Sequence, residues 1–269
     1  MQENRKKPVI QVKNVYKIFK LGEEKVRALD GVSVSIYKGE FVAIVGTSGS
    51  GKSTFLNMMA GLDRPTRGEI IIAGHHIEKL SESRLVDFRR EHVGFIFQAY
   101  NLLPQMNAIE NVALPLSFRG MEKKKRERLA VNALKMVGLE KYMAHRPTEM
   151  SGGQQQRVGI ARALVLDPQI IFADEPTGNL DSHTTLDILH LMQEIVHEKQ
   201  QTLVMVTHDN HLASFADRRI RIIDGVIVDD DEEAEEAGSG EETGEGGDEK
   251  ETKALKGSEN PEETGGADA

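Results

Sequence analysis

The chain has 269 residues and a formal net charge of −9, with 39% hydrophobic and 29% charged residues. This length allows one large α/β domain or one domain with a small insert. There is no cysteine, which excludes a disulfide framework, a thiolate nucleophile and a cysteine-ligated zinc or iron–sulfur site. The longest apolar runs are strand-sized, far below the roughly 20 residues that a membrane helix needs. Residues 1–8 are charged, with no apolar run behind them, and do not resemble a secretory signal. Any membrane role is therefore expected to come through a partner.

The net negative charge comes from the C-terminal segment. Residues 229–269 contain 17 Asp and Glu and 3 Lys, so they carry −14 and the residues before them carry +5. This segment has one leucine and no aromatic residue, so it cannot bury enough apolar surface to offset the entropy of ordering. We predict one domain at 1–228 and a disordered acidic tail at 229–269. The tail is interpreted as a solubilising appendage, with a regulatory or partner-binding arm as the alternative.

Strands and helices alternate along the domain. Residues 9–12 and 32–36 have the pattern of antiparallel strands, and Phe41–Val45 is a continuous apolar run that stops at glycine, as a buried strand would. A helix is predicted at 53–60, followed by strands at 69–72 and 93–97. Residues 99–166 are rich in helix, with helices at 122–137 and 154–166. The remaining predictions are strands at 170–173, 203–207 and 220–223 and a helix at 182–199.

A glycine-rich loop follows the strand at Phe41–Val45 and opens a helix. It fits the pattern G-x-x-x-x-G-K-[ST]. Glycines let the backbone wrap around phosphates and point successive N–H groups inward, and the helix N-terminus adds positive potential. In this pattern the lysine reaches the β- and γ-phosphates and the hydroxyl after it ligates Mg²⁺. The loop predicts a nucleoside triphosphate site made by Gly46, Thr47, Ser48, Gly49, Ser50, Gly51, Lys52, Ser53 and Thr54.

A second apolar strand, at 170–173, runs into two acids, Asp174 and Glu175. The carboxyl end of a buried strand puts Asp174 beside the phosphate loop, where it can hold Mg²⁺ through water. Glu175, one residue on, faces another direction and can accept a proton from the water that attacks the γ-phosphate. The alternative is that the two acids cap a turn before Pro176.

Another glycine-rich segment, Ser151, Gly152, Gly153, Gln154 and Gln155, opens the helix at 154–166. With the two elements above, it makes residues 10–228 resemble the ATP-binding cassette (ABC) ATPases. Gln98, the segment at 151–155, the acidic strand, Asp181 and His208 occur in that family's order. The resemblance implies an α/β fold with a P-loop NTPase core, an antiparallel β subdomain and an inserted α-helical subdomain at about 99–166. It also implies an ATPase with ATP and Mg²⁺ as cofactors.

The resemblance also implies roles for single residues. Gln98 is similar to the glutamine that senses Mg²⁺ and water and links the nucleotide to a partner, so the metal site is Ser53, Gln98 and Asp174. His208 is similar to the histidine that contacts the γ-phosphate. Gln154 and Asp181 belong with the nucleotide-binding residues. Phe19 matches the aromatic residue that stacks on adenine, and Tyr16 is its competitor.

In this family, two chains sandwich ATP head to tail. The resemblance therefore implies a homodimer in the ATP-bound state, with Ser151 and Gly153 of one copy covering the nucleotide held by Lys52 of the other. It places the chain on the cytoplasmic side of the cell membrane as a peripheral subunit bound to an integral-membrane permease. Residues 110–116, 151–157 and 173–182 resemble the lipoprotein-releasing and macrolide-exporting branch, whose relatives also act in cell division.

Three further features are given simpler interpretations. His75 and His76 lie in a turn with no third ligand near in sequence, so they are not assigned to a metal. Residues 123–128 are interpreted as the polar face of a helix rather than a nucleic-acid patch, since no aromatic residues interleave with them. The apolar stretch at 102–118 is interpreted as a groove for a partner's helix, with plain core as the alternative.

The main alternative function is a soluble ABC-type ATPase that acts on nucleic acid or ribosomes. Such proteins usually carry two cassettes, coiled coils or zinc modules, and this chain has one cassette and no cysteine. We therefore expect no nucleic-acid partner. A nucleotide-binding switch without turnover would lack the base, and Glu175 is present.

Overall fold

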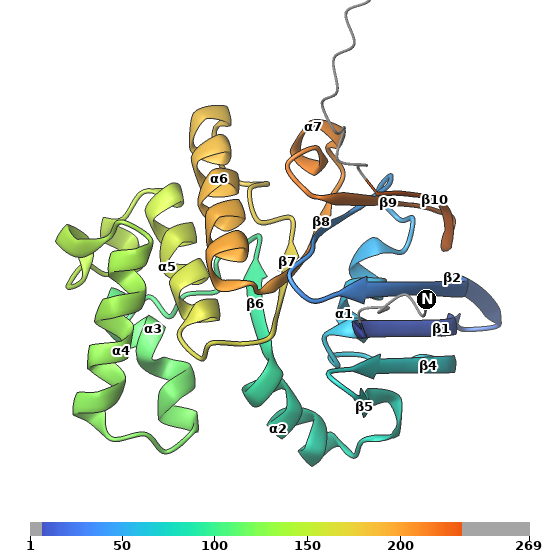
Figure 1. The fold of residues 1–269 in the computed structure, drawn as a ribbon, viewed down its shortest axis with the longest axis horizontal. Helices are drawn as coiled ribbons and strands as arrows, with labels where there is room; N and C mark the ends of the chain where they lie inside the picture. Colours follow the sequence, from blue (N-terminus) through green and yellow to red (C-terminus); the bar gives the residue numbers. More distant parts are fainter. Residues whose placement is uncertain (1–6, 233–269) are drawn as a thin grey trace, which may run out of the picture. The chain divides into compact units, whose positions relative to one another are not determined.

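The computed structural model describes residues 7–232 and contains two β-sheets and seven α-helices in that range (Figure 1). The strands are β1 (Pro8–Leu21), β2 (Glu24–Tyr37), β3 (Phe41–Val45), β4 (Arg67–Ile72), β5 (His75–His76), β6 (Val93–Phe97), β7 (Ile170–Asp174), β8 (Thr202–Thr207), β9 (Arg218–Ile223) and β10 (Val226–Glu232). The helices are α1 (Lys52–Met59), α2 (Glu82–His92), α3 (Ala108–Phe118), α4 (Lys123–Met136), α5 (Gly152–Leu164), α6 (Ser182–Lys199) and α7 (Asn210–Ala213), with short 3₁₀ turns η1 (Ile77–Lys79), η2 (Glu140–Tyr142) and η3 (Pro147–Glu149).

The larger sheet has six strands in the order β10-β9-β3-β8-β7-β6. The strands from β9 to β6 run parallel, and β10 pairs antiparallel with β9 at the edge. All five residues of β3 are buried, because both faces of the sheet are covered. The smaller sheet is antiparallel, in the order β2-β1-β4-β5.

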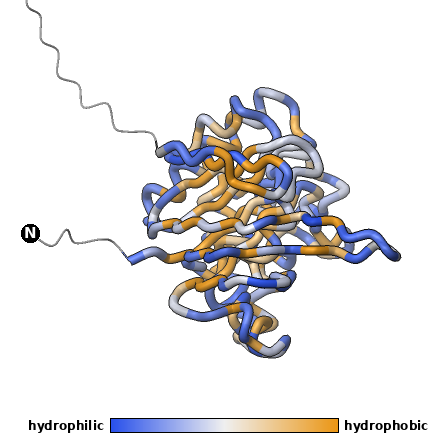
Figure 2. Tube along the Cα trace, turned by 90° about the vertical axis from the view of Figure 1, so that its right-hand side faces the viewer, coloured by the Kyte–Doolittle hydropathy of each residue, from blue (hydrophilic) through white to orange (hydrophobic). Residues whose placement is uncertain are grey.

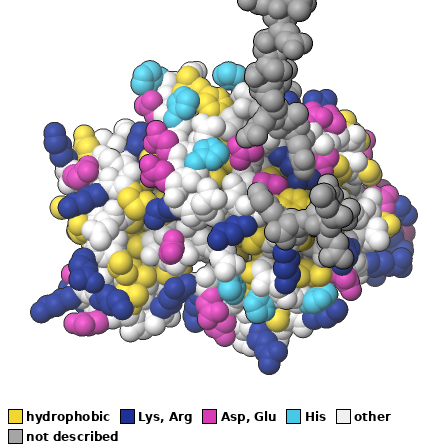
Figure 3. Space-filling model, viewed as in Figure 1, with side chains coloured by type: hydrophobic (Ala, Val, Ile, Leu, Met, Phe, Trp, Pro, Cys, Tyr) yellow, Lys and Arg dark blue, Asp and Glu magenta, His cyan; other side chains and the backbone are white. Residues whose placement is uncertain are grey.

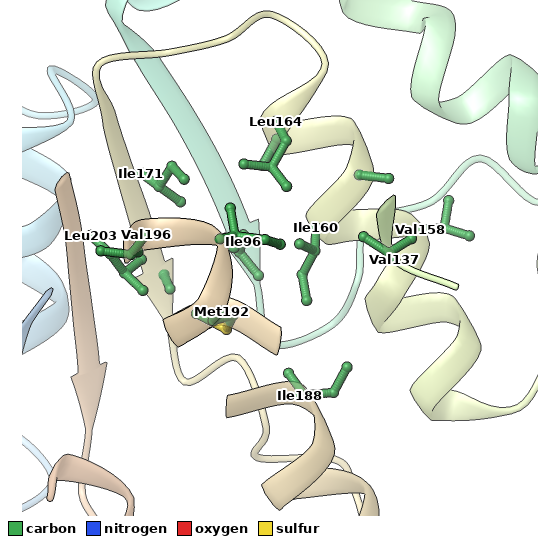
Figure 4. Close-up of a cluster of buried hydrophobic side chains, with 14 of the residues drawn as sticks. Ile96, Val137, Val158, Ile160, Leu164, Ile171, Ile188, Met192, Val196 and Leu203 are labelled. Carbon is green, nitrogen blue, oxygen red and sulfur yellow. The ribbon is translucent and has the colours of Figure 1, made fainter. Parts of the chain in front are cut away.

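Successive residues of the central strands enter two different hydrophobic cores. One core joins the sheet to α3, α4, α5 and α6; in Figure 4, Ile96, Ile171 and Leu203 of the sheet lie opposite Ile160 of α5 and Met192 and Val196 of α6. The other core joins the alternate residues, such as Val42 and Ile44, to α1, α2 and the antiparallel sheet. Figure 2 shows the resulting hydrophobic strands inside the trace and hydrophilic residues on the outer loops. The carboxyl ends of the parallel strands are thereby fixed between two packed layers.

The predicted fold class is confirmed: a P-loop type core, an antiparallel β subdomain and a helix-rich insert. The strand at 9–12 proves to be much longer, as β1 pairs with β2 up to Leu21. The sequence analysis missed α2, since only Leu85 and Phe88 of that helix are buried and its apolar pattern is weak. Residues 123–128 do form the polar start of α4, where Lys124, Lys125 and Arg128 are exposed. No helix within residues 7–232 is long and apolar enough to cross a bilayer.

Residues 229–232, predicted as the start of the acidic tail, form the end of strand β10 instead. Strand β10 continues through Glu232 because its acids face arginines of β9. Arg218 binds both carboxylate oxygens of Asp230, at 2.7 and 2.8 Å, and donates to the Ser35 carbonyl at 2.9 Å. These charge-assisted bonds offset the poor strand propensity of aspartate. The rest of the predicted tail lies outside the described residues.

A single buried asparagine fixes the segment that leaves β6. Asn111 on α3 is fully buried. Its Oδ1 accepts the Leu103 N–H at 2.8 Å, and its Nδ2 donates to the carbonyls of Leu103 at 3.1 Å and Met106 at 3.0 Å. The bonds hold the backbone after Gln98 against α3, because a buried backbone group without a partner is costly.

We expect Asn111→Leu to lower the free energy of unfolding by about 2–4 kcal/mol, since it leaves several buried backbone groups unpaired. Denaturant unfolding measures this loss. Asn132→Leu, at an exposed position of α4, is the matched control and should change stability by less than about 0.5 kcal/mol. Equal effects of the two substitutions would contradict the role given to Asn111.

Candidate active site

The phosphate loop joins β3 to α1, as the motif predicts. Helix α1 begins at Lys52, and Gly51 before it has φ 102°, a conformation that L residues rarely adopt. A Cβ on Gly46 would lie 2.2 Å from the Ile222 carbonyl oxygen, and a Cβ on Gly51 would lie 2.3 Å from that of Ala28. Gly49, with φ 81°, faces open space. The outer side of the loop is therefore in close contact with other backbone segments, while its tip is open.

Lys52 lies inside this loop. Its Nζ donates to the carbonyl oxygens of Gly46 at 2.8 Å and Thr47 at 2.7 Å. Burial lowers the pKa of the Lys52 ammonium, while the nearby carboxylates of Glu175 and Asp174 oppose that shift. Backbone carbonyls thus hold the ammonium at the position where the sequence motif predicts a phosphate.

Asp174 ends β7 beside the first turn of α1. The Ser53 hydroxyl donates to Asp174 Oδ1 at 3.1 Å. Burial raises the pKa of Asp174, while the bond from Ser53 and the charge of Lys52 act in the opposite direction. A carboxylate and a hydroxyl are hard oxygen ligands of the kind that Mg²⁺ prefers. The open loop tip, the buried ammonium and this oxygen pair fit a phosphate group with a magnesium ion.

Glu175 and His208 meet at the ends of β7 and β8. His208 Nδ1 lies 3.0 Å from Glu175 Oε1. Glu175 has φ 43°, uncommon for a residue with a side chain, and its N–H donates to the Val206 carbonyl at 3.0 Å. The chain therefore turns sharply after Asp174, and the two acids point differently, as predicted. The pair lies on one wall of an open cleft of about 320 Å³ that continues to α6 and α7.

His211 lines the same cleft as His208, and further histidines lie on α6. Figure 3 shows histidine and acidic side chains together over α6. Two histidines of α6 pair with acids: His183 lies 3.4 Å from Asp187, and His197 lies 3.8 Å from Asp217. His208 differs from them because it follows a buried strand of the sheet and contacts the acid next to Asp174.

Gln98 lies beside the loop that carries Glu175. A Cβ on Gly178 would lie 2.6 Å from Gln98 Nε2, so the glutamine side chain packs directly on that glycine. Asn179 Nδ2 donates to the Gln98 carbonyl at 3.0 Å. The structure thus brings together Lys52 with Asp174, Glu175 with His208, and Gln98 with the loop after Glu175.

The segment at 151–154 begins α5 but does not join this group. Ser151 caps the helix: its hydroxyl accepts the Gln154 N–H at 3.3 Å, and Gln154 Oε1 accepts the Ser151 N–H at 3.0 Å. Gly152 lies against the Tyr100 hydroxyl and Gly153 against Thr184 of α6. Among residues 7–232, no hydrogen bond or ion pair connects 151–154 to the phosphate loop. One copy of the chain therefore presents two separate glycine-rich helix starts.

Asp181 and Phe19 are also outside the central group. Asp181 caps α6, accepting from Thr184 N at 3.0 Å and Thr184 Oγ1 at 2.7 Å, and these bonds lower the pKa of Asp181. Phe19 is 39% exposed, and its ring lies 4.9 Å from Lys17 Nζ. The competing Tyr16 is half-buried, with its hydroxyl against Gly31. Phe19 thus has the freer ring face, and its stacking role stays a prediction.

Sequence reasoning missed the residues that support the site from behind. Tyr100 and Asn101 both have positive φ, at 58° and 50°, directly after the Gln98 segment. Arg162 of α5 donates to their carbonyls, at 2.7 Å to Tyr100 and 2.5 Å to Asn101. An arginine in the apolar second half of α5 was the available signal. Asn179, which bonds to Gln98, gave no local signal beyond its place before Asp181.

The comparisons with known proteins agree with this geometry. Residues 29–178 match the family described as ABC transporter. An uncharacterised ABC transporter ATP-binding protein of Thermotoga maritima is 49% identical over 221 residues, 82% of this chain and 94% of that protein. The macrolide export ATP-binding/permease protein MacB of Hyphomonas neptunium is 48% identical over 83% of this chain. That match covers only 34% of MacB, so the chain spans about a third of its length.

A solved structure has a similar fold. It is the dimeric structure of a post-hydrolysis state of the ATP-binding cassette MJ0796 bound to ADP and Pi. Its TM-score is 0.77 at 45% identity, over 83% of this chain and 98% of that one.

Asp174→Asn should raise the melting temperature at pH 7 in the absence of nucleotide and Mg²⁺. Burial raises the pKa of Asp174, so between the unfolded and folded pKa values the folded chain holds more protons, and the free energy of unfolding rises as pH falls. At pH 7 the ionised carboxylate is therefore a net cost to the fold, which the neutral amide removes. Thermal unfolding measures the shift, and the gap to the unsubstituted chain should narrow as pH falls through the raised pKa.

Asp87→Asn, on the exposed side of α2, is the control and should give no such rise. Added ATP and Mg²⁺ should then stabilise the unsubstituted chain more than Asp174→Asn. A lower melting temperature for Asp174→Asn in the ligand-free state would show that attraction to Lys52 outweighs burial.

Proposed function

Since this chain belongs to the ABC transporter family, we propose that it is the ATP-hydrolysing subunit of a transporter whose membrane-spanning part is a separate permease. The chain is an ATPase of the ABC cassette type and uses ATP with Mg²⁺. The process that it powers is export, lipoprotein release or force transmission across the cell envelope. The observation that carries the proposal is the convergence of Lys52, Asp174, Glu175 and His208 at one edge of the parallel sheet.

Each of these residues has a distinct task in hydrolysis. Lys52 and the loop N–H groups bind the phosphates, and Ser53 and Asp174 hold Mg²⁺, with Gln98 completing that site. The ion, when bound, offsets the negative charge of the phosphates. Glu175 Oε accepts the proton of the attacking water, and His208 Nδ1 holds the Glu175 carboxylate in place. The His208 ring is exposed, so it can also contact the γ-phosphate.

The active form is a homodimer that closes on ATP. Two observations support this: Ser151, Gly152, Gly153 and Gln154 form a separate helix start with no bond to the phosphate loop of their own chain, and Ser151 itself is exposed. A helix N-terminus favours an anion. A two-fold axis gives two equal sites, each with Lys52 from one copy and Ser151 from the other. The related MJ0796 cassette, dimeric with ADP and Pi, supports the same arrangement.

We assign the permease contact to the groove between α3 and α4. The stretch predicted as a groove contains helix α3, which has two different faces. One face, with Val112 and Leu116, is buried in the core, and the opposite face is open to solvent. The groove there has a volume of about 250 Å³, an apolar floor and a charged rim. Its lining includes Ile109, Leu114, Lys123, Arg126 and Glu127. Such a surface suits an amphipathic helix on the cytoplasmic side of a membrane protein, which would hold this chain at the membrane surface.

Glu175→Gln should keep ATP affinity but lower the turnover rate roughly 100- to 10,000-fold, because the amide cannot accept the proton. With ATP and Mg²⁺, this variant should elute from size exclusion as a dimer, because the ATP that holds the two copies together is no longer hydrolysed. Steady-state ATPase assays and size exclusion measure both effects.

Glu194→Gln, exposed on α6, is the matched control for this experiment and should retain full turnover. If Glu175→Gln stays monomeric at saturating ATP, the composite two-copy site is wrong, whatever the turnover rate.

Purification from membranes tests the permease proposal. The unsubstituted chain should retain an integral-membrane protein, and Leu114→Asp should lose it because the charge enters the apolar floor of the groove. Mass spectrometry of the retained proteins identifies the partner. Recovery of ribosomes or nucleic acid in place of a membrane protein would contradict the transporter assignment.

A further inference from the structure

The C-terminal hairpin lies directly behind the phosphate loop. Strands β9 and β10 are joined by the turn Asp224–Gly225, with φ 47° and 77°. This hairpin follows the residues that match the family, which end at 178. Gly225 has no side chain, so any role of this residue in the site has to come from its backbone.

The backbone of the turn bonds to two separate segments. The Gly225 N–H donates to the Ser50 carbonyl of the phosphate loop at 3.0 Å. The Gly225 carbonyl accepts the Asp30 N–H of β2 at 2.9 Å. One residue of the hairpin therefore links the phosphate loop to the antiparallel subdomain.

The contact leaves no room for a side chain at Gly225. A Cβ on Gly225 would lie 2.8 Å from the Ala28 carbonyl oxygen, and a Cβ on Gly51 would lie 2.3 Å from the same oxygen. The Ala28 carbonyl is thus enclosed between the phosphate loop and the turn. At the other end of the loop, Gly46 lies against the carbonyl of Ile222 in β9. Both ends of the phosphate loop rest on the hairpin.

The bond to Ser50 also determines where a phosphate-binding donor points. The Ser50 carbonyl and the Gly51 N–H belong to one planar trans peptide, so they point in opposite directions. Because the carbonyl is held by Gly225, the Gly51 N–H points away from the hairpin. Rotation of this peptide would remove a donor from the anion and present a carbonyl oxygen to it instead.

We propose that Gly225 is a positioning residue for ATP binding: by holding the Ser50 carbonyl, the turn of the C-terminal hairpin sets the phosphate loop in its binding conformation. The effect is on nucleotide affinity, because the turn touches no reacting atom. At saturating ATP, binding itself restores the loop, so the turnover rate should change little.

A second turn of the same kind provides the control. Ala73 and Gly74 join β4 to β5 with φ 48° and 82°, nearly the values of Asp224 and Gly225. A Cβ on Gly74 would meet nothing within 4 Å. Gly74→Ala therefore imposes the same backbone strain as Gly225→Ala without the collision against Ala28.

The test compares Gly225→Ala with Gly74→Ala. Gly225→Ala should raise the KM and the Kd for ATP with Mg²⁺ at least tenfold, with kcat within twofold of the unsubstituted chain. Gly74→Ala should leave all three within twofold, and it should lower the melting temperature less than Gly225→Ala does, because it adds backbone strain without a collision. Equal nucleotide affinities in the two variants, or a loss confined to kcat, would overturn the proposal.

Hydrogen exchange on the unsubstituted chain gives a second readout that needs no variant. Because the coupling is reciprocal, ATP with Mg²⁺ should slow exchange of the Gly225 amide at least tenfold, while the amides of the Ala73–Gly74 turn should not respond. If the Gly225 amide exchanges equally fast with and without nucleotide, the hairpin does not position the loop, even where Gly225→Ala fails to fold.

Discussion

Backbone N–H groups are oriented for an anion in advance when the carbonyls of the same peptides are held elsewhere. The phosphate loop meets this condition through three kinds of contact. The Lys52 side chain binds two of the loop carbonyls, the first turn of α1 binds another, and the C-terminal hairpin binds that of Ser50. The bonds are Lys52 Nζ to Gly46 and Thr47, Phe55 N to Gly51, and Gly225 N to Ser50. The rest of the fold serves to keep these partners in place.

The same arrangement has an energetic cost that falls on the charged residues. The parallel strands end between two hydrophobic cores, so the groups at their ends are partly removed from water. Burial lowers the pKa of Lys52 and raises that of Asp174, and each shift disfavours the charged form. A bound phosphate with its magnesium ion supplies the missing countercharges, so the ligand stabilises a site that is costly without it.

The parts of the site that the sequence predicted are those encoded by consecutive residues. The phosphate loop, the acids after β7 and the serine that caps α5 each have a local pattern with a physical reason, so they could be identified without a structure. The parts of the fold and the site that the sequence did not predict depend on contacts between distant segments. Arg162 matters because α5 packs beside the Gln98 segment, and β10 is a strand because Arg218 pairs with Asp230. An acidic stretch read alone predicts disorder, and only the neighbouring arginines reverse that prediction.

The link between the two ends of the chain bears on how this module can be moved between proteins. The segment matched to the family, 29–178, omits β1, β8, β9 and β10, and with them His208 and the backbone on which Gly46 rests. A graft of that segment into another protein would carry the whole phosphate loop but not the strands that support it. A transferable unit has to run from β1 to the last residue of β10, since the motif and its foundation are separated by most of the length of the polypeptide.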